Sequence, residues 1–171
     1  MTQLSLKQFV PSEVCLKCDG CCRYKDEDSA WRPKSGAEDQ ADLAALITGR
    51  DVLDAQGYIK TIRDCGKHFC QFLNRGDNTC GIYAKRPFEC SLYPFILSQT
   101  SSAVKVYVHL SCPYVQDHLP HADYDSYVAY LKGFFRREDI RGFLLRNRAM
   151  FHDYSPYAPE LLYLFDLSSG F

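Results

Sequence analysis

The sequence predicts a small α+β domain in which a cysteine-rich metal-binding core carries one or two β-hairpins and is flanked by helices. Nine of the 171 residues are cysteines, and eight of these lie between Cys15 and Cys90. The middle of the chain alternates apolar and polar residues around Gly- and Asn-rich turns. From Asp123 onward, apolar residues recur at helical spacing. Strands and helices are therefore both expected around a thiol-rich segment.

The length of the chain favours one domain over residues 1–171. A chain of this size buries roughly 70% of its unfolded surface, so it does not need metals or disulfides merely to compensate for a small core. We expect a cysteine-cluster core from about residue 11 to about 115, and a C-terminal helical region with a docked tail from about 120 to 171. The cysteines then indicate a specific chemical role.

The N-terminal part of the chain is expected to be mainly helix and loop. Pro11-Ser12-Glu13 predicts a short helical turn that presents the first cysteines. The charged segment 26–35 predicts a loop, and the apolar spacing in 37–47 predicts a helix. A second short helix is expected over 51–56, ended by Gly57.

Two β-hairpins are predicted in the middle of the chain. The first pairs 69–73 with 79–83 across the turn residues 74–78, which are rich in Gly, Asn and Asp. The second pairs 95–97 with the alternating segment 104–110. If the first hairpin forms in this register, Cys70 and Cys80 lie on paired strands and face the N-terminal cysteines together.

The C-terminal part predicts helices followed by a tail. Asp123 is a candidate N-cap. The apolar face continues beyond Gly133 and consists of Tyr127, Leu131, Phe134, Phe135, Ile140, Phe143 and Leu144. From Phe151 the prolines predict a segment that lies over the surface. Its docking residues are expected to be Leu161, Leu162, Leu164 and Phe165.

Composition excludes several classes of protein. No apolar run approaches the roughly 20 residues that span a bilayer, so no membrane association is expected. The N-terminal residues lack the pattern of a secretory signal, and we therefore expect the reducing cytoplasm, where clustered thiols bind metal more often than they form disulfides. A net charge of −1 gives no bulk attraction to nucleic acid, which is not an expected partner.

The densest motif is Cys15-x-x-Cys18-x-x-Cys21-Cys22. A Cys-x-x-Cys turn brings two sulfurs within reach of one ion, and Zn²⁺ then needs two more ligands for a tetrahedron. The same spacing suits three corners of a [4Fe–4S] cluster. Because neighbouring side chains diverge, Cys21 and Cys22 are expected to serve different sites, or one of them lies outside the first ligand sphere.

A second group of thiols lies downstream, at Cys70, Cys80 and Cys90. Arg86-Pro87 precedes the last of these and predicts a turn that directs Cys90 inward. The Arg86 guanidinium can donate hydrogen bonds to thiolates and offset their charge. Cys112-Pro113 is typical of the last cysteine in a cluster loop.

Taken together, these motifs resemble those of the YkgJ-like cysteine-cluster proteins, whose domain name refers to the chelation of zinc or iron. The resemblance rests on CxxCxxCC followed by C-x-IY-xx-RP-xx-C-xx-YP, which includes Tyr83 and Arg86. It implies a metal-ligand set consisting of Cys15, Cys18, Cys21, Cys22, Cys70, Cys80, Cys90 and Cys112. It also implies that Arg86 and Tyr83 lie next to these ligands. Ser91 departs from the family, in which many members carry a basic residue at this position.

Other candidate residues favour simpler interpretations. Cys65 matches no position of the family and is expected to be a spare thiol. His118-Leu-Pro-His121 has a spacing that metals can use, but the proline and the surplus of thiols favour a surface loop. His68, His109 and His152 have no partner in the sequence. Residues 132–148 hold six Lys/Arg against two Asp/Glu, which favours a solvated basic helix face.

The leading functional hypothesis is a cysteine-ligated metal protein, with an iron–sulfur cluster or Zn²⁺ in a structural or electron-transfer role. One rival is an enzyme: a protein-modifying relative of the flagellin lysine methylases, which share this cysteine domain, or a thiol oxidoreductase. Another is a zinc-stabilised protein-interaction module. The sequence names no catalytic residue. A protein partner is expected to contact the cationic residues Lys85, Arg86, Arg136, Arg137 and Arg141.

Overall fold

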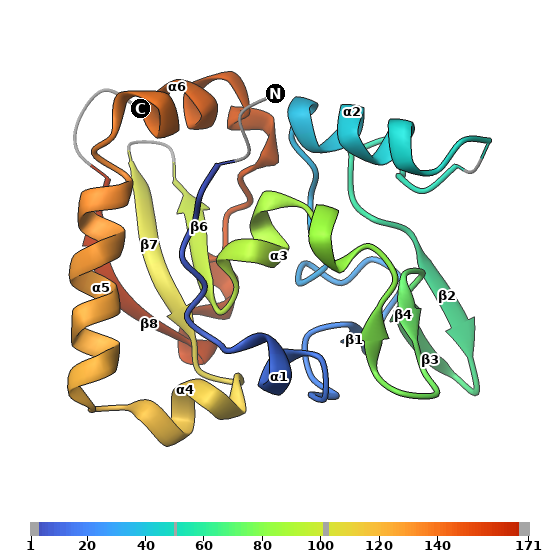
Figure 1. The fold of residues 1–171 in the computed structure, drawn as a ribbon, viewed down its shortest axis with the longest axis horizontal. Coiled ribbons are helices and arrows are strands. Elements are labelled where there is room, and N and C mark those ends of the chain that lie inside the picture. The colour runs from blue at the N-terminus through green and yellow to red at the C-terminus, as the bar shows by residue number, and fades with distance from the viewer. Residues whose placement is uncertain (1–3, 50, 101–102, 168–171) are drawn as a thin grey trace. The chain divides into compact units, whose positions relative to one another are not determined.

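The computed structural model describes residues 4–49, 51–100 and 103–167. Helices and antiparallel sheets alternate along the chain, which confirms the predicted α+β class (Figure 1). The described residues form two compact units. We call residues 10–91 the cysteine unit, and residues 4–9 together with 92–167 the aromatic unit. None of the helices in the described part of the chain is both long and apolar enough to cross a membrane.

The elements of the cysteine unit are short. They are α1 (Ser12–Cys15), β1 (Arg23–Tyr24), α2 (Ala37–Leu46), β2 (Thr61–Asp64), β3 (Lys67–Cys70), β4 (Leu73–Asn74), β5 (Thr79–Cys80), the 3-10 helix η1 (Tyr83–Lys85) and α3 (Phe88–Leu92), whose last residue belongs to the aromatic unit. Strands β1, β3 and β2 form one antiparallel sheet in that order, and β4 pairs with β5. Their core is formed by Tyr24, Leu43, Val52, Ile59, Cys70, Phe72 and Ile82. The predicted helical turn at Pro11 and the helix over 37–47 are both present.

The first predicted hairpin is shorter than expected, and the prediction that Cys70 and Cys80 lie on paired strands is wrong. Strand β3 ends at Cys70, which lies opposite Thr61 of β2, whereas Cys80 lies opposite Leu73. The chain leaves the first sheet because Phe72 turns into the core, where its carbonyl accepts the Gly81 N–H at 2.8 Å. Burial of this aromatic ring therefore divides one predicted strand into two.

The predicted helix over 51–56 is absent. The Asp54 carboxylate accepts the backbone N–H groups of Gln56 and Tyr58, at 3.0 and 2.9 Å. Such side-chain bonds compete with the helix and favour a turn. Gly57 completes the turn with φ +86°, a conformation that glycine adopts without a steric penalty.

The aromatic unit is built on a second antiparallel sheet of three strands. Its elements are β6 (Phe95–Gln99), β7 (Val104–His109), α4 (Pro113–His118), α5 (Ala122–Phe134), α6 (Glu138–Arg146), the 3-10 helices η2 (Arg148–Met150) and η3 (Ser155–Glu160), and β8 (Leu161–Asp166). The β6–β7 hairpin confirms the second predicted hairpin. The predicted surface tail is wrong over 161–166, because these residues form β8 and pair with β7. An apolar, aromatic-rich segment gains backbone hydrogen bonds by joining a sheet.

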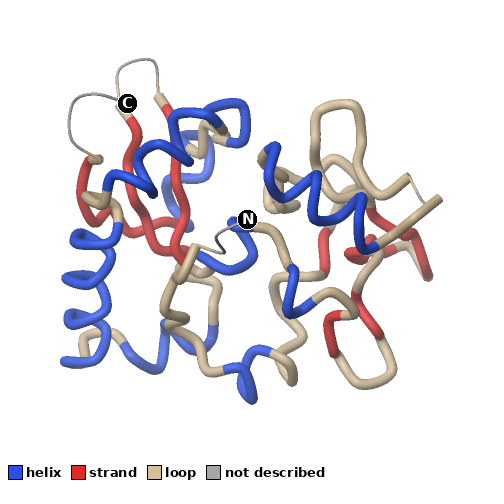
Figure 2. Tube along the Cα trace, turned by 45° about the horizontal axis from the view of Figure 1, so that its top comes forward, coloured by secondary structure: helices blue, strands red, loops and turns tan. Residues whose placement is uncertain are grey.

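Aromatic packing joins the helices of this unit to its sheet. Helix α5 runs along the sheet, where Phe95 stacks on Tyr127 with ring centroids 5.0 Å apart (Figure 1, Figure 2). The ring of Phe9 packs edge-on against Phe95 and Tyr114, at 5.5 and 5.3 Å. Helix α5 begins at Ala122 after the N-cap His121, so the cap predicted at Asp123 was two residues late. Short helices α3 and α4 were not predicted.

The half-buried side chains of Asp39 and Glu89 attach α3 to α2 and to the loop before α2. Asp39 accepts the N–H groups of Gly36 and Phe88, at 3.1 and 3.2 Å. Glu89 accepts the Lys34 N–H at 2.6 Å. Burial raises the pKa of Asp39 to about 6 and that of Glu89 to about 8. These bonds fix the orientation of the short helix that carries Cys90.

Replacing Asp39 by alanine should lower the free energy of unfolding by about 1–2 kcal/mol, because two buried N–H groups lose their acceptor. The folded protein holds the Asp39 proton more tightly than the unfolded chain. The contribution of Asp39 to stability therefore falls as the pH rises from 3.8 to about 6. The loss measured by urea unfolding should be larger at pH 4 than at pH 7. Asp42→Ala, on the same helix, should change stability by less than about 0.5 kcal/mol at either pH. Equal losses in both variants would contradict this role.

Candidate metal centre

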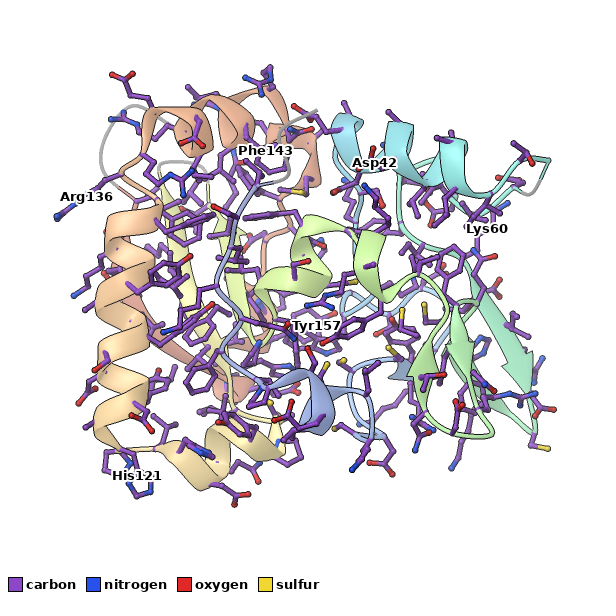
Figure 3. The ribbon with its side chains drawn as sticks, in the orientation of Figure 1. Asp42, Lys60, His121, Arg136, Phe143 and Tyr157 are labelled. Atoms are coloured by element: carbon purple, nitrogen blue, oxygen red, sulfur yellow. The ribbon has the colours of Figure 1, made fainter. Side chains whose placement is uncertain are left out.

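Eight of the nine cysteines lie in the cysteine unit, and seven of these, all except Cys65, lie in or next to α1, β1, β3, β5 and α3. Cys15 ends α1, Cys18, Cys21 and Cys22 lie in the turn before β1, Cys70 ends β3, Cys80 ends β5, and Cys90 lies within α3. In Figure 3 several yellow sulfur atoms lie close together beside α1 and β1. Segments separated by more than 60 residues of sequence thus bring their thiols to one region.

Cys22 lies at the middle of this group. Its thiol is hydrogen-bonded to the thiols of Cys21 and Cys70, and its carbonyl oxygen accepts the Cys70 N–H at 2.9 Å. The pKa of Cys22 is lowered to about 3, and the hydrogen bond with Cys21 is the largest cause. These two hydrogen bonds favour ionisation of Cys22 over that of its neighbours. Repulsion from Cys22 also raises the pKa of three further thiols in this region, those of Cys15, Cys80 and Cys90.

The surrounding thiols are held in an environment that opposes their ionisation. Burial is the largest cause that raises the pKa of Cys15, Cys80 and Cys90, and repulsion from Cys22 adds to it. For Cys70 the hydrogen bond to Cys22 is the largest cause of its raised pKa, followed by burial. Several buried thiols that repel one another when charged require a cation before they can ionise together. This donor set fits a metal that binds sulfur.

Arg86 supplies positive charge beside the cysteines. Its guanidinium lowers the pKa of Cys15, Cys80 and Cys90, opposing the effect of burial. It lies 3.9 Å from the centroid of the Tyr83 ring and donates to the Tyr83 carbonyl at 3.2 Å. Its buried Nε has no hydrogen-bond partner among the described residues. Within the described part of the chain, this donor is therefore available to a bound group.

Tyr83 connects this arginine to α1. Its hydroxyl lies 3.0 Å from the Ser12 hydroxyl, and a side-chain hydrogen bond from Tyr83 to Cys15 lowers the pKa of that thiol. The family resemblance placed Arg86 and Tyr83 next to the ligands. In the structure both residues lower the pKa of Cys15. The sequence motif that joins them, Tyr83-x-x-Arg86-Pro87, folds as the 3-10 helix η1 and the turn after it.

The cysteine segments lie in one region, but their side chains do not have the geometry that an ion requires. Across 4–49, 51–100 and 103–167, no group of three or more His, Cys, Asp or Glu side chains has the arrangement needed to hold a metal. Side-chain rotations about Cys22 would be required before several sulfurs reach one ion at the roughly 2.3 Å typical of Zn–S bonds. The backbone brings the segments together, and the ligand geometry depends on the metal.

The two cysteines not among these seven are Cys65 and Cys112. Cys65 occupies the exposed turn between β2 and β3 with φ +46°, and its thiol lies 3.6 Å from Asp64. This position agrees with its expected role as a spare thiol. Cys112 is buried in the aromatic unit, where its N–H donates to the His109 carbonyl at 3.3 Å. Its assignment as an eighth ligand remains a prediction.

Sequence reasoning did not identify Glu89 and Tyr24 as neighbours of the cysteines. Glu89 precedes Cys90 and raises the pKa of that thiol. Tyr24 is buried, and its hydroxyl pKa is raised by that burial and by the charge of Cys70 and Cys22. The sequence could have indicated this proximity, because Glu89 is one residue from Cys90 and Tyr24 is two residues from Cys22.

The basic segment lies in the aromatic unit. Arg137 donates twice to Asp139, at 3.1 and 2.7 Å, so its charge is offset at the start of α6. Lys132, Arg136 and Arg141 line a cavity of about 190 Å³ together with Phe135, Phe165, Asp166 and Leu167. The binding of a protein partner to these cationic residues remains a prediction.

Comparison with known proteins identifies one family. Residues 14–113, more than half of the chain, match the CxxCxxCC family, described as a "putative zinc- or iron-chelating domain". Neither the curated proteins nor the solved structures contain a match to this sequence. The matched region includes every cysteine that the sequence motifs assigned to metal, from Cys15 to Cys112. The chain therefore belongs to the CxxCxxCC family.

Proposed function

We propose that the cysteine unit holds a thiolate-ligated metal centre, an iron–sulfur cluster or Zn²⁺, in a structural or electron-transfer role. The observation that carries the proposal is that the thiols of five other cysteines, from four separate segments of the chain, interact with that of Cys22: Cys15, Cys21, Cys70, Cys80 and Cys90. The ligands would be drawn from Cys15, Cys18, Cys21, Cys22, Cys70, Cys80 and Cys90, with Cys112 as a further candidate. Arg86 would offset part of the negative charge of the sulfurs.

A metal accounts for this arrangement better than free thiols do. Without a cation, only one of several adjacent buried thiols can ionise at little cost, because each added charge is both desolvated and repelled by Cys22. Binding a cation removes the protons and converts this repulsion into attraction. A structural metal supplies about 10–16 kcal/mol of apparent binding free energy, which is comparable to the stability of a whole domain.

The spacing of the cysteines bears on the choice between an iron–sulfur cluster and Zn²⁺. Cys15-x-x-Cys18-x-x-Cys21 has the spacing that iron–sulfur clusters use, and this favours a cluster. Zn²⁺ suits four thiolates equally well and needs no redox partner. A cluster would add electron transfer to the structural role, whereas zinc would only link the segments that carry its four cysteine ligands. We favour the iron–sulfur cluster.

Anaerobic purification, an absorption spectrum and elemental analysis should distinguish the two. A cluster gives a brown protein with broad absorption near 400 nm and several iron atoms per chain, because sulfide-to-iron charge transfer lies in the visible range. A colourless protein with stoichiometric zinc would exclude the cluster and retain the cysteine site. Absence of both metals, after reconstitution as well as after purification, would overturn the proposed function.

Cys22→Ser should reduce metal content and stability together, because Cys22 is hydrogen-bonded to two of its neighbouring thiols. Loss of a metal-dependent contribution of about 3 kcal/mol would lower the melting temperature by about 10 °C. Cys80→Ser, at the end of β5, should act in the same direction. Cys65→Ser is the matched control and should change neither quantity, because this thiol is exposed at a hairpin turn. An equal loss at all three positions would show that the ligands were chosen wrongly.

Arg86→Ala should weaken metal binding by about 10–100-fold, the usual effect of removing a group that supports the ligands. Competition with a chelator measures this change. Arg86→Lys keeps the charge but loses the planar donors, so it should restore only part of the affinity. Lys85→Ala, one residue earlier and exposed, is the control and should bind metal normally. An Arg86→Ala variant with unchanged affinity and an unchanged spectrum would exclude a supporting role for Arg86.

A further inference from the structure

Two histidines in the aromatic unit lie together on its surface, and the cysteine centre gives them no role. His118 is the last residue of α4, and His121 is the residue before α5. Their ring centroids are 6.1 Å apart, with an angle of 74° between the planes. They line an open hollow of about 400 Å³ with Asp117, Ala122 and Asp123. Figure 3 labels His121 on the outside of the molecule, at the start of α5.

The backbone fixes which nitrogen of His118 can bind a metal. Its Nδ1 lies 2.7 Å from the carbonyl oxygen of Tyr114, and a carbonyl oxygen can only accept a hydrogen bond. The proton is therefore on Nδ1, and the neutral ring keeps its lone pair on Nε2. A hydrogen bond of this kind fixes the tautomer of histidines that ligate metals.

Aromatic stacking holds the same ring in place. The His118 ring lies parallel to the ring of Tyr114, with centroids 3.8 Å apart and planes 20° apart. Phe9 meets the His118 ring edge-on at 6.3 Å. His118 is therefore oriented before any ligand arrives, which reduces the entropy lost on binding.

The charges around the hollow favour a cation. Its lining residues include two carboxylates, Asp117 and Asp123, and no lysine or arginine. The N-terminus of α5 carries a partial positive charge that opposes a cation, but Asp123 and Asp125 lie in its first turn and offset it. Imidazole and carboxylate groups together suit divalent transition metals such as zinc.

We propose that His118 and His121 form a second metal site, which binds one zinc-like divalent ion through two imidazole nitrogens. Imidazoles that share a metal at about 2.1 Å have ring centroids about 5 Å apart, so the exposed His121 ring needs to approach the half-buried His118 ring by about 1 Å. No third protein ligand is in place among the described residues. Water would complete the coordination, and the two aspartates would accept hydrogen bonds from that water.

Calorimetric titration with Zn²⁺ tests the site in the full chain, after the metal content of the cysteine centre has been measured and that centre has been saturated. The wild type should bind one additional zinc per chain. His118→Gln and His121→Gln should each weaken this binding by about tenfold or more, because each removes one of two protein ligands. His152→Gln, a histidine outside the hollow, is the matched control and should retain the binding. Long-range ¹H–¹⁵N NMR should show that zinc shifts the Nε2 resonance of His118 while Nδ1 stays protonated.

Zinc binding by the histidine variants decides whether the second site exists. If the additional zinc binds with the same affinity to both glutamine variants, or if Cys65→Ser alone abolishes it, the ion is held elsewhere. A wild type that takes up no zinc beyond the cysteine centre also excludes the site. The proposed cysteine centre is judged separately by its own metal content, so failure of one site leaves the other standing.

Discussion

The cysteine unit depends on the position of Cys22. Its carbonyl oxygen accepts the Cys70 N–H, which attaches the loop after α1 to the end of β3, and its thiolate accepts hydrogen bonds from Cys21 and Cys70. One residue thus joins the N-terminal CxxCxxCC loop to the downstream cysteines through both backbone and side chain. The other thiols surround a negative charge that they cannot share without a cation.

The rest of the cysteine unit holds these segments in place with few regular elements. Strands of two to four residues and a five-residue helix supply little cohesion of their own. Asp39 and Glu89 connect α3 to the segments before it, and their buried carboxyl groups carry raised pKa values as a consequence. The aromatic unit differs, since its longer strands and helices surround buried residues such as Val106, Leu131 and Ile140. The metal is therefore expected to stabilise the first unit far more than the second.

Much of the candidate centre could be predicted from local sequence. The spacing of Cys15, Cys18 and Cys21 is local, and so is the motif that places Tyr83 and Arg86 on one 3-10 helix and its turn. The central role of Cys22 could not be predicted, because adjacent cysteines look equivalent in the sequence. Its contact with Cys70 joins residues that are 48 positions apart in the sequence, and it depends on the pairing of β1 with β3.

The sequence by itself determined the α+β class, the helix over 37–46, the β6–β7 hairpin and the helical faces of α5 and α6, because each depends on residues close together in the chain. Only the tertiary structure decided that Cys70 lies opposite Thr61, that 51–56 forms a turn and that 161–166 joins the sheet as β8. The burial of Phe72, the acceptor bonds of Asp54 and the backbone pairing of β8 with β7 each outweighed the local pattern. Contacts between distant segments lower the free energy of the folded state by burying apolar groups and by satisfying backbone hydrogen bonds. The local periodicity of the sequence does not reveal these contacts.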